Sequence, residues 1–167
     1  GKVYIGISAP LGTIVGRVFC LNAADGTLLW NYTAGGSIRS SPAVVDGKVY
    51  IGSANNKVHC LNAADGMLVW NYTTGGLVPS SPAVAEGKVY IGGYDKKLTC
   101  LDATTGTLIW NYTTGGTVHA SPAVSDGKVY VGSVDDKVYC FDAGSGALIW
   151  SYTTRGDVYC SPAVANG

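Results

Sequence analysis

Hydrophobic and polar residues alternate along the chain in short runs, each bounded by Gly, Asp, Asn or Pro. In the unit that starts at residue 41 the runs cover Lys48–Ser53, Lys57–Asn62 and Met67–Thr73, and Val78–Val84 begins the next unit. Alternation with period two, β-branched residues and frequent glycines predict β-strands and argue against helices. The chain is therefore expected to be all-β.

Turn sequences join the predicted strands in a fixed order. Asp46-Gly47 precedes one strand, and the same place later holds Glu86-Gly87, Asp126-Gly127 and Asn166-Gly167. Asp-Gly and Asn-Gly suit a type I′ hairpin, because glycine adopts the positive φ that the turn requires. Asp65-Gly66 supplies a second turn later in the unit. Consecutive strands should therefore be antiparallel.

The predicted strands belong to a unit of forty residues. Residues 41–80 and 81–120 are identical at 24 of 40 positions, and Ser-Pro-Ala-Val begins at Ser41, Ser81, Ser121 and Ser161. Four antiparallel strands in a unit of this length are typical of a propeller blade. We predict one domain over residues 1–167, a β-propeller of four four-stranded blades.

One stretch of each unit resembles a known motif. Residues 100–110 read Cys-Leu-Asp-Ala-Thr-Thr-Gly-Thr-Leu-Ile-Trp and resemble the tryptophan-docking motif of pyrroloquinoline-quinone (PQQ)-type repeats, Ala-x-Asp-x-x-Thr-Gly-x-x-x-Trp. Cys replaces the first Ala in every unit, and Asn22 and Asn62 replace the acid that Asp102 and Asp142 match. The resemblance implies that each tryptophan packs on the neighbouring blade and locks the two together. These tryptophans are Trp30, Trp70, Trp110 and Trp150.

The two ends of the chain carry complementary parts of one blade. It begins with a second strand, Gly1–Ile7, and ends with a first strand, Val158–Val164. Pairing of these strands within one chain closes a four-bladed ring, whereas exchange between two chains gives an eight-bladed homodimer. A window from a longer array is a third reading. The eight-bladed dimer is favoured, because the resemblance is to the repeats of larger rings.

The same resemblance bears on catalysis. Quinoprotein dehydrogenases of this family carry an adjacent cysteine pair, a Ca²⁺ ion held partly by Glu, and an Asp base. Here no two cysteines are adjacent, and the only glutamate is Glu86, in a hairpin turn. We expect no enzymatic activity and no cofactor, with a fragment of a PQQ-dependent oxidoreductase as an alternative. His59 and His119 are expected at the surface or lining the channel.

No metal site or disulfide is expected. The cysteines in the motif lie on separate blades, beyond the reach of a disulfide, and lack the spacing of a zinc site. They are Cys20, Cys60, Cys100 and Cys140. Cys160, on an innermost strand, is expected to be a buried free thiol, with an exposed thiol or an inter-chain link as alternatives. Asp95, Asp135 and Asp136 are loop acids without the spacing of a calcium loop.

Composition narrows the classes of partner. The formal net charge is zero at 13% charged residues, and Lys and Arg form no cluster, which argues against a nucleic-acid partner. No apolar run approaches the ~20 residues of a membrane span. Asn-Tyr-Thr sequons at Asn31, Asn71 and Asn111 are potential N-glycosylation sites. With the habit of the family, they favour an extracytoplasmic location, periplasmic, at the cell surface or secreted.

Differences between the four units mark a candidate binding site. They concentrate at the entry to the innermost strand and in the loop between the second and third strands, including the longer loop Ala9–Gly16. Both places lie on one face of a propeller. Side chains predicted to rim the channel there are Arg39, Tyr94, His119, Asp157 and Tyr159. Drift at solvated positions is the competing explanation.

These observations favour a non-catalytic binding or scaffold propeller that presents this face to a protein partner. Two alternatives stay open: a propeller that binds a small molecule or a carbohydrate, and a designed or recently amplified repeat protein without a ligand.

Overall fold

The structure is a computed structural model that describes residues 1–8 and 15–165. The described residues form fifteen strands in four antiparallel sheets that follow one another along the chain. The first sheet holds β1 (Lys2–Ile7), β2 (Arg17–Asn22) and β3 (Leu28–Thr33). The second holds β4 (Ala43–Val45), β5 (Lys48–Ser53), β6 (Lys57–Asn62) and β7 (Leu68–Thr73).

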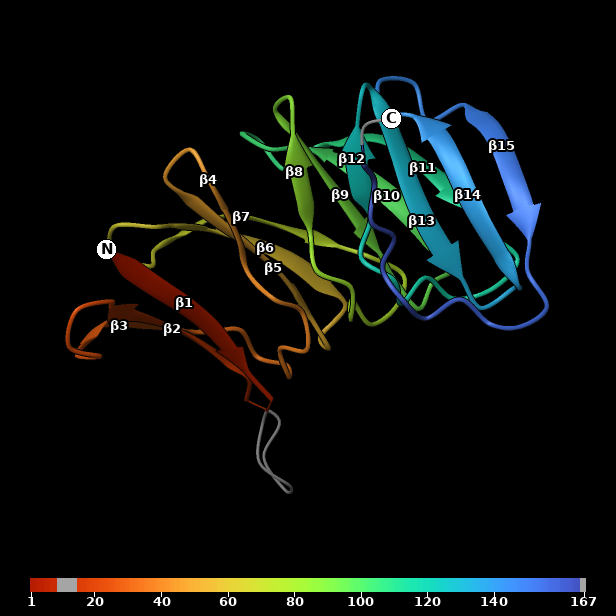
Figure 1. Ribbon diagram of the computed structural model, residues 1–167. Helices are drawn as coiled ribbons and strands as arrows, with labels where there is room; N and C mark the ends of the chain where they lie inside the picture. Colours follow the sequence, from red (N-terminus) through yellow and green to blue (C-terminus); the bar gives the residue numbers. More distant parts are fainter. Residues whose placement is uncertain (9–14, 166–167) are drawn as a thin grey trace.

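The last two sheets repeat the second. The third holds β8 (Ala83–Ala85), β9 (Lys88–Gly92), β10 (Lys97–Asp102) and β11 (Leu108–Thr113). The fourth holds β12 (Ala123–Ser125), β13 (Lys128–Ser133), β14 (Lys137–Asp142) and β15 (Leu148–Thr153). Figure 1 shows the sheets side by side in chain order, as the blades of a β-propeller that do not close on themselves.

Local sequence sets the hairpins as predicted. Asp46 and Gly47 both have positive φ, 48° and 69°, which is the backbone of a type I′ turn between β4 and β5. The acid-glycine pairs before β9 and β13 repeat it. In the later turn of the third sheet, Asp102 accepts hydrogen bonds through Oδ1 from the backbone N–H groups of Thr104 and Thr105, at 2.9 and 2.8 Å. These bonds hold the turn between β10 and β11.

The hydrophobic core lies between blades. Each of three clusters of buried residues joins two consecutive sheets. One of them joins Tyr90, Leu98 and Trp110 of the third blade to Val129 and Phe141 of the fourth. A blade is therefore stabilised mainly by its neighbours, as in other repeat folds.

Two details of the predicted strands are wrong. The innermost strands are three residues long, so that β8 covers Ala83–Ala85 and not Val78–Val84. The reason is Pro82, which has no N–H to donate to a ladder. The first blade has three strands, because Val158–Val164 forms none: β1 pairs only with β2, and the described C-terminal residues are in no sheet.

The predicted closure is therefore not formed within the chain. β1 and the last described residues lie at different ends of the row of blades (Figure 1), and β1 pairs only with β2. The predicted turn Asn166-Gly167 lies outside the described residues.

Candidate functional site

The variable positions meet on one face, where the loops between second and third strands contact the segments that enter the innermost strands. The N–H of Tyr94 donates to the carbonyl of Leu77 at 2.8 Å, and the N–H of Val118 donates to Gly93 at 3.0 Å. Equivalent bonds join Ala54 to Ser37 and Val134 to Thr117, at 2.9 and 3.1 Å. Most of the predicted longer loop Ala9–Gly16 lies outside the described residues.

A row of three aromatic rings runs along this face. The ring of His119 lies between Tyr94, with centroids 4.6 Å apart, and Tyr159, with centroids 5.2 Å apart and an edge-on geometry. The Tyr159 hydroxyl donates to Oδ2 of Asp157 at 2.9 Å. This bond raises the pKa of Tyr159, and desolvation lowers the pKa of His119, so its imidazole is mainly neutral at pH 7. We call Tyr94, His119 and Tyr159 the aromatic row.

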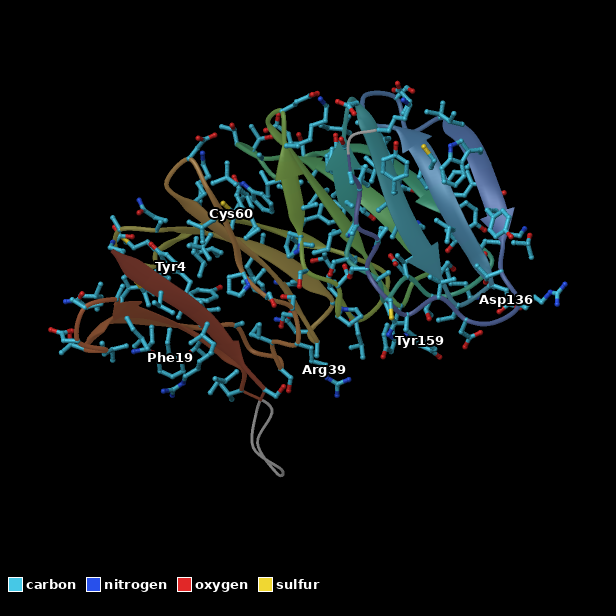
Figure 2. All side chains as sticks on the ribbon, in the orientation of Figure 1. Tyr4, Phe19, Arg39, Cys60, Asp136 and Tyr159 are labelled. Carbon is cyan, nitrogen blue, oxygen red and sulfur yellow. The ribbon has the colours of Figure 1, made fainter. Side chains whose placement is uncertain are left out.

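Arg39 stands at the other side of Tyr94. The two side chains line a small pocket together with Leu77 and Pro79. Its cavity volume is about 10 Å³, room for no more than a single water molecule. Figure 2 shows Arg39 and Tyr159 along the same edge of the molecule. Ring contacts and a hydrogen bond therefore link Tyr94, His119, Tyr159 and Asp157, and Arg39 lines the pocket beside Tyr94.

The loop acids have structural partners. Oδ2 of Asp95 accepts the N–H of Gly75 at 3.0 Å, and Oδ2 of Asp135 accepts the N–H of Gly115 at 2.7 Å. Tyr139 also donates to Asp135, at 2.5 Å. Within residues 1–8 and 15–165, no group of three or more His, Cys, Asp or Glu side chains is placed to hold a metal ion.

Two expectations about single residues are corrected. His59 is buried, 3% exposed, because the blade before it covers its ring: the Tyr32 hydroxyl lies 3.2 Å from Nδ1. This desolvation, with the charge of Lys57, lowers the pKa of His59 to about 4. Cys160 is exposed and not buried, because its segment pairs with no strand among the described residues. The four cysteines of the motif are buried and free.

The blade interfaces contain three of the four motif tryptophans. The indole N–H groups of Trp30, Trp70 and Trp110 donate to the carbonyls of Ala63, Ala103 and Ala143 in the following blades, at 3.3, 3.2 and 3.2 Å. Trp150 is 44% exposed, against 8 or 9% for the other three. The sequon residues Asn31, Asn71 and Asn111 are all exposed, on β3, β7 and β11.

A serine ladder along the innermost segments was not predicted. The N–H of Ser41 donates to Oγ of Ser81 at 2.8 Å, and Ser81 and Ser121 donate in the same way to Ser121 and Ser161, at 2.9 Å. The signal was present, since a polar residue stands at the same place in each Ser-Pro-Ala-Val motif. Only the fold shows that these serines meet one another.

Comparison with known proteins extends this description. A family model described as outer membrane protein assembly factor BamB matches residues 14–121 and 113–167. No curated protein sequence matches the chain. Among solved structures, BamB from Moraxella catarrhalis is similar at 22% identity and a TM-score of 0.72, over 92% of this chain and 50% of that one.

Two further structures are similar at low identity. The computationally designed Ika8 protein matches at 14% identity and a TM-score of 0.80, over 94% of this chain and 52% of that one. Quinohemoprotein alcohol dehydrogenase from Comamonas testosteroni matches at 21% identity and 0.76, over 92% of this chain and 34% of that one. The chain thus spans about half the length of BamB and Ika8.

These structural similarities show the fold alone, a β-propeller, because the sequence identities are low. The family follows from the family model, which matches more than half of the chain, and from the tryptophan motif in its blades. The chain belongs to the PQQ-like repeat family that the BamB model describes.

Proposed function

We propose that the chain is a non-catalytic binding module, a scaffold that offers the aromatic row and its two flanking charges to a protein partner. One observation carries the proposal: of five side chains that differ between the units, four are joined by ring contacts and a hydrogen bond, and the fifth, Arg39, lines the pocket beside Tyr94. The residues that hold the blades together, by contrast, repeat from unit to unit.

The chemistry of this face suits a protein surface. Tyrosine and arginine are enriched at the centres of protein interfaces, where a planar side chain offers contact area with little entropy to lose. Tyr159 is 57% exposed, and Arg39 and Asp157 are exposed beside the aromatic row. A partner segment with an apolar centre and charges of both signs would match it.

The pocket beside Arg39 does not suit an enclosed small molecule. Its volume of about 10 Å³ is far below the roughly 300–1,000 Å³ of small-molecule sites. The match to a family described by outer membrane assembly supports a protein partner and an extracytoplasmic location. The part of the chain that the structure describes contains no helix that could cross a membrane.

A displayed peptide library tests the proposal. Peptides selected on the wild-type chain are compared by titration calorimetry on the wild type, on a His119→Ala/Tyr159→Ala variant and on Met67→Ala. Met67 is a matched control, because its side chain is exposed in the turn before β7, away from the aromatic row. We expect binding to weaken about 10-fold or more in the double variant alone. Equal affinities, or a selection that enriches no peptide, would contradict the proposal.

A further inference from the structure

We infer that the two uncovered faces of the row of blades bind each other across two copies of the chain, so that the dimer is an eight-bladed ring with two-fold symmetry. The inference does not depend on the proposed function. It rests on a set of contacts between blades that occurs three times inside the chain. The last blade contains the donor side of this interface, and the first blade contains the acceptor side.

Every internal interface is built in the same direction. At the second one, the Trp70 indole N–H and the Tyr50 hydroxyl both donate to the carbonyl of Ala103 in the next blade, at 3.2 and 3.1 Å. The Trp70 ring packs on the turn glycine, Gly106, so closely that a Cβ added there would lie 2.5 Å from the ring. Tyr4 and Tyr90 donate likewise to Ala63 and Ala143, and Trp30 and Trp110 pack on Gly66 and Gly146.

The last blade carries the donor half of such an interface without an acceptor. Trp150 stands where Trp70 stands, and all six residues of β15 are exposed. Its neighbour Tyr130 keeps the ring contact of the other blades, with centroids 6.0 Å apart, against 5.9 Å for Tyr50 and Trp70. The donor half is therefore already formed in this blade.

The first blade carries the acceptor half without a donor. Ala23 takes the place of Ala103 but is exposed, whereas the counterparts in the other blades are buried. Gly26 has the φ of Gly106, +73°, yet a Cβ there would meet nothing within 4 Å. The turn is thus shaped to receive an indole ring that the chain itself does not supply.

The edges of the two end blades match in the same way. β1 has one unpaired edge, and the segment after Cys160 is in no strand. Applying the register of β4 and β5, in which Ala43 faces Tyr50 and Val44 faces Val49, places Ala163 opposite Tyr4 of a second copy and Val164 opposite Val3. Each copy would then complete the first blade of the other.

Two more repeated contacts continue across this junction. The serine ladder would extend from the N–H of Ser161 to Oγ of Ser41 in the second copy. Ser40 and Ser80 bond the backbone of Gly52 and Gly92 through their hydroxyls and are buried. Cys160 is their counterpart and would be covered by Gly6 of the second copy. The dimer would thus bury the Cys160 thiol, which is exposed in a single chain.

The ring also completes the aromatic row. Positions 39, 79, 119 and 159 are equivalent in the four units, and Tyr159 already contacts His119. The next position in the ring is Arg39 of the second copy, which would bring a guanidinium group to Tyr159 and Asp157. Opposite charges would then meet at the junction.

For the 167-residue chain, a second copy is the occupant that the structure favours, because both halves of the interface lie uncovered on this chain. A head-to-tail contact closes when its rotation divides the circle, and otherwise builds an open filament. The chain covers 50% of BamB and 52% of Ika8, so two copies together match the length of either protein.

Sedimentation velocity and thiol titration of the 167-residue chain test the inference. We expect twice the chain mass of 17.2 kDa, and protection of Cys160 from Ellman's reagent that is lost on dilution. Trp150→Arg should give a monomer with one fast-reacting thiol. Ile149→Ala is the matched control, because Ile149 is as exposed as its counterpart Ile109 inside the row of blades.

Mixing two variants separates a lost interface from a lost fold. Trp150→Arg destroys the donor half and Ala23→Arg the acceptor half, so a mixed dimer retains one intact junction whereas neither variant alone retains any. We expect the mixture to dimerise more strongly than either variant. A monomer at all concentrations, a filament, a dimer that survives Trp150→Arg, or a dimer with reactive Cys160 would each overturn the inference.

Discussion

The indole N–H of Trp70 donates to the backbone carbonyl oxygen of Ala103, 3.2 Å away in the next blade. The contact crosses from the outermost strand of one blade to the turn of the next, and its acceptor is backbone. The acceptor oxygen belongs to the backbone and is present whatever residue stands at position 103, so the docking depends on the tryptophan and on a turn that leaves room for its ring.

Replacement of Trp70 by Ala should therefore lower the free energy of unfolding strongly. Loss of a buried tryptophan costs about 3–5 kcal/mol. Trp150→Ala serves as control and should cost about 1 kcal/mol or less in the monomer, because that ring is half exposed. Urea denaturation at a concentration where the chain is monomeric measures both. Equal losses would show that interface docking is not the source of the stability.

Gly26 and Gly106 have the same backbone φ but different surroundings. Substitution of each therefore separates the cost of backbone strain from the cost of steric crowding against Trp70. Gly26→Ala and Gly106→Ala both place a Cβ at φ +73°, which costs about 1 kcal/mol or more through backbone strain. Only in Gly106→Ala does the methyl group collide with Trp70, and overpacking adds about 1–3 kcal/mol. We expect the second variant to unfold at a clearly lower urea concentration when both are measured at a concentration where the chain is monomeric. Matching midpoints would exclude the crowding.

Stability should fall as the pH is lowered from 6.5 to about 4. The pKa of His59 in the folded chain is about 4, below its ordinary value, so the unfolded chain binds more protons in this window. The slope attributable to His59 approaches about 1.4 kcal/mol per pH unit.

His59→Phe, which copies Phe19 of the first blade, should remove most of that slope. A smaller slope remains from His119, whose pKa is also lowered. Thermal unfolding followed by circular dichroism across this range provides the comparison. A wild-type chain as stable at pH 4.5 as at pH 7 would be evidence against a buried neutral His59.

Secretion from a eukaryotic cell should add glycans at Asn31, Asn71 and Asn111, because all three side chains are exposed on outer strands. Asn111→Gln should remove one glycan, and Ser151→Asn, which creates the sequon missing from the fourth unit, should add one. Intact mass before and after peptide-N-glycosidase reports each step. A secreted wild type whose mass is unchanged by the glycosidase would refute the assignment.

The blades could be predicted well because each unit contains the residues that form its own turns. Asp46-Gly47 defines a hairpin by local backbone preference alone, and the alternation in Lys57–Asn62 selects the strand. The aromatic row could be assigned to one face, since topology fixes where loops and entries meet. Its contacts could not be predicted, because they join residues 25 to 40 positions apart whose rings meet only after packing.

Burial was harder to predict than topology. His59 is covered by Tyr32 of the preceding blade, whereas Cys160 lies in a segment that no described strand pairs with or covers. In both cases the environment depends on a neighbouring blade and not on the residue's own unit. The repeat pattern predicts the contacts that all units share. The burial of a side chain in the first or last blade differs, because one side of that blade has no neighbour within the described residues.

The serine ladder gives the molecule a polarity. Each N–H in it donates to the hydroxyl one unit further along, as do the tryptophans to their alanines, and none of these bonds points backward. The blades are thus arranged head to tail, like the subunits of a polymer, but are covalently joined. Further blades would be joined by the same bonds, and the angle between blades decides whether such a series closes into a ring. In the proposed dimer, a substitution that flattened the angle between blades would therefore convert the closed ring into a fibre.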